Sequence, residues 1–485
     1  MTLAAANVWD VAAMATDVSP ARRWIKNRTA LARFFAVVGV VCFGGALPAA
    51  SEPAAAFASL SLDDILKRDA LTGDWGGRRK KLEDAGIKLG VQEQSELWGN
   101  LAGGFRQGVH YNGLAIPSAN FDLEKLWGLK GGLIYTQFYE IHGRGPSATL
   151  VGNQQLLSNI EATPGFKLYM LYYEQQLFGD RLNVRIGQEG ANDEMMLAPS
   201  AALFLNSSFG FPDHLAQNLP NGGPNYPLAV PMVRARLKVS DELTLVGSAF
   251  DGDPAGPGAG DPQRRNATGT EFRLKDPVLG FGEVWYSYGQ AENSKILAGT
   301  IKLGAWYHDG VFRDRSRDIN GAPLAQTNGS GRPYRGDYAF YGIVDQMLWK
   351  QPGTKDGGIT AFGLVMVGPD DRNRESAYVE GGFNWKGLFG RPNDIAGIAV
   401  AYAQTSDSLR RFGAESIAFT GAGKAYKPHE TVIEATYYYQ IAPWFSVQPD
   451  VQYVINPGAS LDQVDPSGKT PTDSLTVGVR TRIDF

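Results

Sequence analysis

The chain ends in the stretch LTVGVRTRIDF, from Leu475 to Phe485, and its side chains alternate between two kinds. One set of alternate positions is apolar apart from Thr481: Leu475, Val477, Val479, Ile483 and Phe485. The other set includes Arg480, Arg482 and Asp484. Because side chains of a strand point alternately to its two faces, this stretch predicts a β-strand with one apolar and one charged face. A dry core would exclude such charges. A transmembrane barrel strand meets lipid on one face and a wet lumen on the other.

The same alternation is found in earlier stretches. Residues 431–441 and 445–455 alternate apolar and polar side chains on either side of a tight turn at Ala442-Pro443-Trp444. Further upstream, arginines alternate with apolar residues over 181–186 and 233–239. Strands of roughly ten residues with short turns have the length that a membrane barrel requires. We therefore predict an all-β fold, a transmembrane antiparallel β-barrel of about 16 strands over residues 91–485.

The composition agrees with this fold and excludes several kinds of chemistry. The 485 residues include 59 glycines, and aromatic side chains make up 11%, which favours strands and turns over helices. Cys42 is the single cysteine and lies in the N-terminal apolar stretch, so a chain processed beyond it has no thiol chemistry. The formal net charge is −4, without the concentrated basic face that nucleic acid requires.

The N-terminal region has the order of a secretory signal peptide. A basic region ending at Arg33 is followed by an apolar run over residues 34–47 and then by small residues. The run is too short to span a bilayer, which takes about 20 residues. We predict that residues 1–58 are removed after Ala58, with Met1 or Met14 as the true start. Residues 59–90 would then form a periplasmic segment with a short helix near Leu60–Asp69, and the barrel would lie in the Gram-negative outer membrane.

Long polar stretches separate some of the predicted strands. Residues 251–265 are rich in Gly, Pro and Asp, and residues 313–335 are polar and contain glycine. Short turns that alternate with long loops match the asymmetry of outer-membrane barrels, whose long loops are extracellular. Both stretches are expected to be loops.

Several motifs carry a more specific likeness. LTGDWGGRRKKLEDAGI over residues 71–87, YEQQLFGDRLNVRIGQ over 173–188 and FLNSSFG over 204–210 resemble the carbohydrate-selective porin family (OprB type). The resemblance implies 16 strands, one long loop folded inward to form a constriction, and passive diffusion of glucose and related sugars into the periplasm. The expected partners are these sugars, outer-membrane lipid and the barrel assembly machinery, which would bind the C-terminal strand ending in Phe485. The protein would be a monomer or a homotrimer.

A sugar path needs several weak hydrogen bonds and flat rings for stacking, so charged and aromatic side chains of the inner face are the candidates. The candidates for the constriction are Arg181, Arg185, Arg234, Arg236, Glu283, Trp285 and Glu380. Glu283 and Trp285 share a phase of the strand alternation, so the sequence leaves open which face Glu283 occupies. Further lumen candidates are Glu434, Asp450, Arg480 and Arg482. The arginine pairs at 181/185 and 234/236 are preferred for the constriction. The alternative for each residue is a lumen salt bridge that braces the wall.

The sequence favours a channel without a cofactor or metal over an enzyme. The five histidines are scattered, and neither an H-E-x-x-H nor a G-x-S-x-G motif is present. Asp251-Gly-Asp253 lacks the spacing of a calcium loop and fits a solvated turn. A general ion porin remains the main alternative, and a barrel enzyme is a remote one. A gated transporter would need a larger N-terminal plug than the dozen residues before the first family motif.

Overall fold

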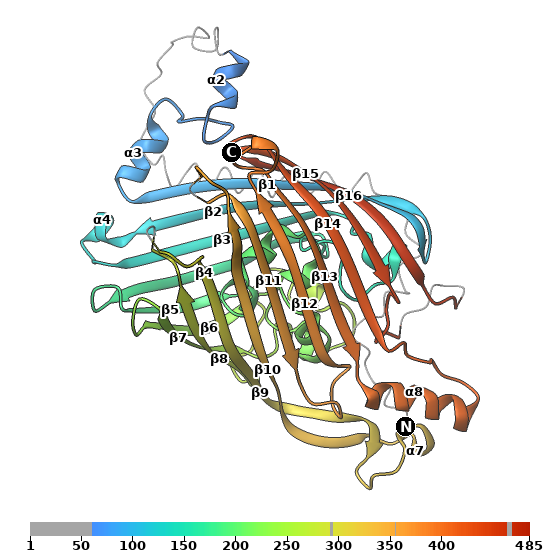
Figure 1. Cartoon of the computed structure of the whole chain (residues 1–485). Coiled ribbons are helices and arrows are strands. Elements are labelled where there is room, and N and C mark those ends of the chain that lie inside the picture. Colours follow the sequence, from blue (N-terminus) through green and yellow to red (C-terminus); the bar gives the residue numbers. More distant parts are fainter. Residues whose placement is uncertain (1–60, 292–293, 355, 463–467) are drawn as a thin grey trace, which may run out of the picture.

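The computed structural model describes residues 61–291, 294–354, 356–462 and 468–485. Within these ranges sixteen antiparallel strands form one closed barrel, in which each strand pairs with its neighbours in sequence (Figure 1). The barrel closes between the first and last strands, where Glu93 pairs with Ile483 and Leu97 with Val479. The predicted fold class and strand number are therefore confirmed.

The strands range from 8 to 20 residues in length. They are β1 (Ile87–Gly104), β2 (Gly108–Asp122), β3 (Gly132–Gly143), β4 (Gly165–Leu177), β5 (Leu182–Glu189), β6 (Val230–Lys238), β7 (Leu243–Asp251), β8 (Val278–Tyr288), β9 (Gly299–Asp318), β10 (Gly331–Lys350), β11 (Gly358–Val367), β12 (Glu375–Lys386), β13 (Ile395–Thr405), β14 (His429–Ala442), β15 (Phe445–Ile455) and β16 (Thr472–Asp484).

The strands predicted near the C-terminus agree with β14, β15 and β16, and residues 443–444 form the tight turn between β14 and β15. The expectation of a loop over residues 313–335 was wrong at both ends. β9 continues to Asp318 and β10 begins at Gly331, so the loop covers only 319–330. The extended ends of β9 and β10 pair with each other, for example Tyr334 with Phe312, although the side chains around this pair are mostly polar.

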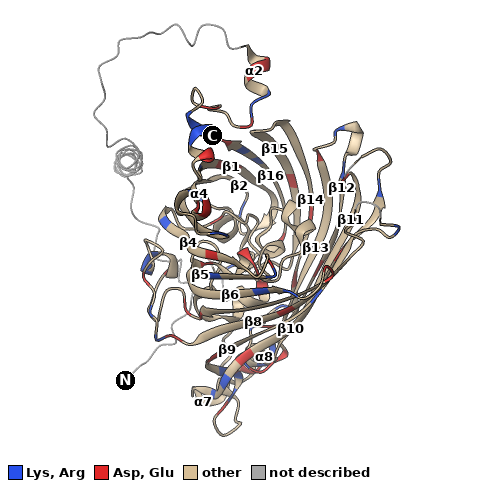
Figure 2. Cartoon of the chain, turned by 90° about the vertical axis from the view of Figure 1, so that its left-hand side faces the viewer, with Lys and Arg blue, Asp and Glu red and all other residues tan. Residues whose placement is uncertain are grey.

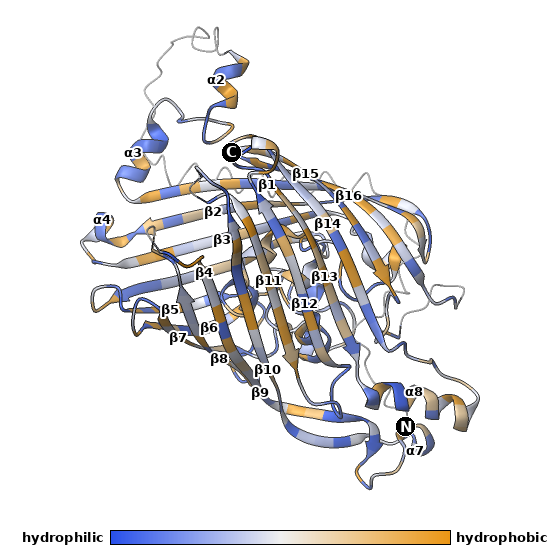
Figure 3. Ribbon diagram, in the orientation of Figure 1, coloured by the Kyte–Doolittle hydropathy of each residue, from blue (hydrophilic) through white to orange (hydrophobic). Residues whose placement is uncertain are grey.

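The alternation of side chains places apolar residues outside and polar residues inside. On β6 the outward Val233 is exposed, whereas the inward Arg234 is fully buried. On β15 the outward Val451 and Tyr453 are exposed, and the inward Asp450 and Gln452 are buried. Figure 3 shows the resulting alternation of hydrophobic and hydrophilic positions along the strands. The polar inner wall is therefore not open to water everywhere.

Helices are few and short. Within the described ranges the α-helices are α2 (Leu62–Leu66), α3 (Arg78–Asp84), α4 (Leu123–Trp127), α5 (Asp213–Asn218), α6 (Pro262–Arg265), α7 (Leu324–Thr327) and α8 (Asp407–Thr420). The Ser61 side chain accepts a hydrogen bond from the Asp64 amide and so caps α2, which lies within the predicted N-terminal helix. None of the helices in the described ranges has the length and hydropathy needed to span a membrane. The predicted signal peptide lies outside the described residues.

The interior is filled by loops from one end of the barrel. The turns at the end where the C-terminus lies are short, as at 178–181 and 239–242, whereas the opposite end bears the loops 144–164, 190–229 and 252–277. Loop 190–229 folds inward, and its Phe204, Phe209 and Leu215 pack against inward side chains of the wall, such as Phe362 and Trp306. Figure 1 shows these loop segments inside the barrel, behind β11 to β13. The family resemblance implies such an inward loop, which strand periodicity alone does not predict.

Candidate functional site

Carboxylates of the barrel wall hold the inward loops by their backbone amides. Glu434 on β14 accepts hydrogen bonds from the amides of Leu205 and Asn206 at 2.6 and 3.0 Å. Glu430, four residues earlier on the same strand, accepts from the Gln155 amide at 2.8 Å in loop 144–164. Both glutamates are fully buried. Each glutamate satisfies backbone amides that the inward loops would otherwise bury without a partner, so these side chains fix the loops against the wall.

Two more wall carboxylates make the same kind of contact on the other side of the barrel. Glu283 on β8 accepts from the Met196 amide at 2.8 Å and from the Tyr341 hydroxyl at 2.7 Å. Asp345 on β10 accepts from the Ser200 amide at 2.8 Å and from its hydroxyl at 3.0 Å. Loop 190–229 is thus held from β8, β10 and β14. We call Glu283, Asp345, Glu430 and Glu434 the loop anchors.

The remaining acidic candidates are also buried. Glu380 accepts a hydrogen bond from the Tyr378 hydroxyl at 2.7 Å, next to the loop residue Ser208. Asp450 accepts from the Gln452 side chain at 3.1 Å. Trp285 lies on the inner face with Glu283 and donates its indole N–H to that carboxylate. The structure therefore places Glu380, Asp450 and Glu283 beneath the loops.

An arginine cluster lies on the inner wall of β4 to β6. Arg185 on β5 forms ion pairs with Glu174 at 2.7 Å and with Glu189. Arg234 on β6 lies 3.4 Å from both Glu174 and Glu194. Arg236, two residues further, lies 3.4 Å from Glu194. Figure 2 shows acidic and basic positions close together where these strands run. The cluster consists of Arg185, Arg234, Arg236, Glu174, Glu189 and Glu194.

The members of the arginine cluster differ in their access to water. The side chain of Arg234 is 0% exposed, whereas that of Arg236 keeps 36% of its surface exposed. The Arg185 guanidinium also lies over the Tyr172 ring, 4.1 Å from its centroid. Three guanidinium groups and three carboxylates give the cluster no net formal charge. Its accessible part therefore offers hydrogen-bond donors without a strong net field.

Arg181 is not part of this cluster. It lies in the exposed turn before β5, where its guanidinium contacts the Val239 carbonyl at 3.5 Å. Arg480 on β16 is bound outside the cluster, to Glu96 at 2.6 Å and to the Asn159 side chain of loop 144–164 at 2.6 Å. Arg482 is exposed and lies 3.2 Å from Asp484. The structure brings together three of the four preferred arginines and leaves Arg181 near the barrel mouth.

Sequence reasoning missed several residues of the site. Glu174 faces Arg185 across β4 and β5, and the register that pairs them was not known in advance. Glu194 comes from loop 190–229, where no alternation indicates direction. Lys302 on β9 donates to the Leu197 carbonyl at 2.7 Å and lies over the Trp285 ring at 4.2 Å. Lys302 lies between Ile301 and Leu303, whose apolar side chains point outward. The strand alternation would therefore have predicted that Lys302 points inward.

A cavity of about 180 Å³ lies between loops 144–164 and 190–229. Its lining combines apolar residues such as Phe211 with amide side chains, among them Asn159, Asn192, Gln217 and Asn225, and Tyr226 adds a ring. Near this cavity, burial raises the pKa of Glu161 to about 7, although the Ser147 hydroxyl and amide donate to its carboxylate. Burial likewise raises the pKa of Asp193 to about 7, against a hydrogen bond from Tyr169. Both carboxyl groups therefore titrate near neutral pH.

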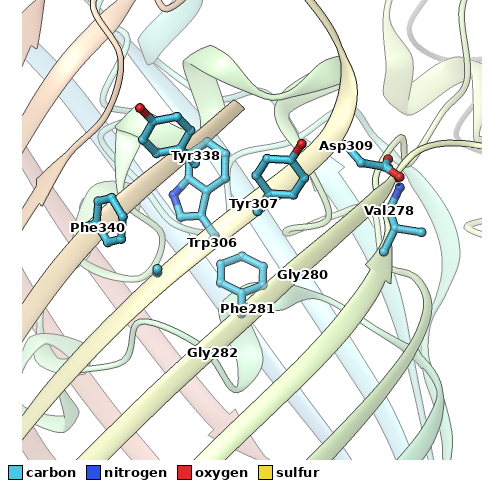
Figure 4. A pocket seen from close by; sticks show the side chains of 10 residues that line it. Val278, Gly280, Phe281, Gly282, Trp306, Tyr307, Asp309, Tyr338 and Phe340 are labelled. Atoms are coloured by element: carbon cyan, nitrogen blue, oxygen red, sulfur yellow. Dashed lines mark hydrogen bonds between the residues drawn. The ribbon is translucent and has the colours of Figure 1, made fainter. Parts of the chain in front are cut away.

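A second hollow, of about 740 Å³, lies elsewhere (Figure 4). It is a groove in the outer wall, lined by the small residues Gly280, Gly282 and Ala305 and by the outward rings of Tyr307 and Phe340. Figure 4 shows these rings above the ribbons of β8 to β10. Because it faces away from the lumen, this groove does not belong to the solute path. Among the described residues, no group of His, Cys, Asp and Glu is arranged to hold a metal ion.

The comparisons with known proteins agree with this architecture. The model of the family "Carbohydrate-selective porin, OprB family" matches residues 106–485. The chain belongs to this family. As a member, it is an outer-membrane porin that passes carbohydrates, a channel and not an enzyme.

Individual relatives align with most of this chain. The chain is 23% identical to Porin B of Pseudomonas aeruginosa over 436 residues, and the alignment covers 86% of this chain and 91% of the relative. It is 22% identical to the putative porin QuiX of Acinetobacter baylyi, with 86% and 93% covered. The high-pH structure of Pseudomonas putida OprB superposes with a TM-score of 0.76 at 21% identity and covers 86% of this chain and 99% of that one. The low-pH structure of the same protein gives a TM-score of 0.53. These structures support the barrel fold.

Proposed function

We propose that sugars such as glucose cross this porin past the arginine cluster, at a constriction formed by β4 to β6 and loop 190–229. The observation that carries the proposal is the neutral set of three arginines and three glutamates, from which Arg236 alone is substantially exposed. A partly neutralised guanidinium still donates hydrogen bonds to hydroxyl groups. A channel must bind its solute weakly enough to release it, and one exposed donor group meets that requirement better than a row of free charges.

The other charged candidates have a second role in this proposal. Glu283 and Glu434 act as loop anchors, and Glu380 and Asp450 support the wall beside them. Trp285 holds Lys302, which in turn holds the Leu197 carbonyl, so its ring positions loop 190–229. Arg480 ties loop 144–164 to β16, and the exposed Arg181 and Arg482 lie toward the periplasmic mouth. Passage needs no cofactor.

The amide-lined cavity fits the outer end of the same path. Asn and Gln side chains both donate and accept hydrogen bonds, as sugar hydroxyls do. A sugar entering between the loops would meet these neutral groups before it reaches Arg236. Each copy of the chain would carry its own path, in a monomer or in a homotrimer.

The C-terminal strand is proposed to bind the barrel assembly machinery during insertion. Phe485 ends the chain beside β1, where its amide donates to the Val91 carbonyl at 2.9 Å. Residues 61–86 are proposed to lie in the periplasm, because α2 and α3 stand at the same end of the barrel as Phe485 (Figure 1). There the Arg79 side chain donates to the Phe485 carbonyl at 2.8 Å.

Solute flux into liposomes tests the proposed path. Purified porin should let glucose enter faster than a singly charged anion or cation of similar size. An Arg185→Gln, Arg236→Gln double variant should lose this preference and keep its permeability to small ions. Equal entry of neutral and charged solutes through the unaltered protein would instead indicate a general porin. Absence of any flux would contradict a channel altogether.

A further inference from the structure

The groove in the outer wall of β8 to β10 has a floor of small residues. Gly280 and Gly282 on β8 and Ala305 on β9 point outward, and the hollow of about 740 Å³ lies over them (Figure 4). Small residues continue along the same row, because Gly282 pairs with Ala305 on one side and with Gly247 of β7 on the other. We call this hollow the outer groove.

The backbone does not require the two glycines of the floor. A Cβ on Gly282 would have no heavy atom within 4 Å, and a Cβ on Gly280 would meet only the carbonyl oxygens of Ser248 and Tyr307, at 3.8 and 3.9 Å. Neither glycine has a positive φ, and β8 pairs with both neighbours without a bulge. Glycine inside a strand often indicates that a ligand or another backbone approaches closely. The free space over the floor is therefore suited to a ligand.

Apolar side chains surround the floor of the outer groove. The exposed rings of Tyr338 and Phe340 on β10 pack edge to face, with centroids 5.9 Å apart, and the exposed Tyr307 ring lies on β9. Toward the periplasmic ends of the strands, the outward Val284 and Leu303 are apolar and exposed. A narrow apolar hollow bordered by rings has the shape and chemistry that an acyl chain requires.

The outer groove lies toward the extracellular ends of its strands. β8 begins at Val278, directly after the long loop 252–277, and Val278 lines the groove. Long loops are on the extracellular side of outer-membrane barrels. Tyrosine rings are enriched where the hydrocarbon layer meets the lipid headgroups, which fits the outward Tyr307 and Tyr338. The groove therefore opens to the outer leaflet.

Two arginines lie on the same outward face, beyond the tyrosines. Arg335 on β10 pairs with the outward Val311 of β9, and Arg313 follows Val311 in the same alternation. Both arginines are exposed, and the Arg313 guanidinium donates to the Gly331 carbonyl at 3.1 Å. The Tyr307 hydroxyl reaches toward Arg335, because a Cβ on the adjacent Gly336 would collide with that hydroxyl. The headgroup end of the groove therefore offers two guanidinium groups.

Acidic side chains at this end of the groove bind backbone amides. Asp309 lines the groove and accepts a hydrogen bond from the Val278 amide at 2.7 Å. Asp251, which pairs with Val278 from β7, is partly buried and accepts from the Asp253 amide at 3.2 Å. The carboxylates thus have donors within the barrel, whereas the exposed arginines can bind an anion.

We propose that the outer groove binds one lipopolysaccharide molecule of the outer leaflet, with an acyl chain over Gly280 and Gly282 and the phosphates of lipid A at Arg313 and Arg335. Guanidinium groups bind phosphate through charge-assisted and often bidentate hydrogen bonds. The order of features along the strands, with arginines, then tyrosines, then the apolar floor, matches the order of phosphate, sugar and acyl chain in that lipid. The site faces away from the lumen and is independent of the sugar path.

Titration of the delipidated porin with deep-rough lipopolysaccharide, followed by native mass spectrometry in mild detergent, tests the phosphate contacts. The unaltered protein should form a one-to-one complex. An Arg313→Gln, Arg335→Gln double variant should raise the half-saturating lipid concentration roughly tenfold, because it loses two charge-assisted contacts. Arg332→Gln is the matched control, since Arg332 is exposed on the same hairpin but lies beside Gly321 in loop 319–330. Absence of a complex, or equal effects of the double variant and the control, would overturn the proposal.

Filling the groove tests the acyl-chain contact in the same titration. Gly282→Leu, or Gly282→Val if the larger side chain impairs folding, should weaken lipopolysaccharide binding severalfold and leave the channel current unchanged. Gly99→Leu is the control, because Gly99 is an outward glycine of β1 whose added Cβ would have its nearest neighbours at 3.8 Å. Equal weakening by the two substitutions would contradict the assignment to the groove. Equally tight binding of phosphatidylglycerol, or of dephosphorylated lipid A, by the unaltered protein would contradict the assignment to lipopolysaccharide.

Discussion

The inner walls of β14 and of β4 to β6 both carry inward charges, yet they serve the molecule differently. On β14, Glu430 and Glu434 are fully buried and bind backbone amides of the inward loops. On β5 and β6, the arginines pair with glutamate side chains, and Arg236 stays partly open. An inward charge therefore lines the path only where no loop covers it. Alternation along a strand predicts the direction in which a side chain points, but not whether a loop covers that side chain.

The largest effect is expected from removing a loop anchor. Glu434→Ala leaves the amides of Leu205 and Asn206 without an acceptor, at a cost of roughly 1–3 kcal/mol for each buried donor. Loop 190–229 should then move away from the wall. We expect a severalfold larger single-channel conductance in planar bilayers and a loss of sugar discrimination. Glu434→Gln, which keeps one carbonyl acceptor, is the matched control and should change conductance less. Unchanged conductance of Glu434→Ala would contradict the anchoring role.

A different effect is expected in the arginine cluster. Arg185→Gln leaves Glu174 and Glu189 with less positive charge and makes the cluster net negative. The channel should become more selective for cations by several-fold, with its conductance little changed, which the reversal potential in a salt gradient measures. Arg482→Gln, at an exposed pair near the mouth, should have a smaller effect because water and salt screen it. If both variants changed the reversal potential equally, the arginine cluster would control ion selectivity no more than the exposed pair at the mouth, which would contradict this prediction.

The smallest effect concerns pH. Since burial raises the pKa of Glu161 to about 7, the folded loop favours the protonated carboxyl. The packing of loop 144–164 should be most stable below the ordinary glutamate pKa and weaken as pH rises from about 4.5 through 7. Hydrogen exchange of this loop, corrected for intrinsic rates, should increase over that range. Glu161→Gln should reduce this dependence, while Asp193 continues to titrate. An identical pH dependence in the variant would refute the assignment.

Much of the fold could be predicted from the sequence, because lipid and water impose opposite demands on the two faces of a strand. The strands at 181–186, 233–239, 431–441, 445–455 and 475–485 and the inward direction of Arg185, Arg234 and Arg236 were all found by alternation. The polar residues 313–335 were mistaken for a loop, because a hairpin that extends into water needs no apolar face. Residues 92–96 of β1 were not recognised as part of a strand, because they are polar at every position and show no alternation.

The site was only partly predictable. Glu380, Glu434 and Asp450 were recognised as inward-facing candidates, whereas the face of Glu283 was left open. The burial of all four depends on loops that come from distant parts of the chain. Arg181 follows the phase of Arg185, yet the strand begins at Leu182 and leaves it in a turn. Glu194 lies in a loop whose position depends on the anchors. Strand periodicity contains no information on any of these contacts.

The central claim is that Arg236 provides the accessible sugar contact of the channel. Glucose titration of single-channel current tests it most directly, with Arg236→Gln compared with the unaltered porin in the same bilayers. The account predicts that the half-blocking glucose concentration rises about tenfold, as the loss of one charge-assisted hydrogen bond of roughly 1.5 kcal/mol implies, while the conductance without sugar stays nearly the same. An unchanged half-blocking concentration in Arg236→Gln would contradict the account.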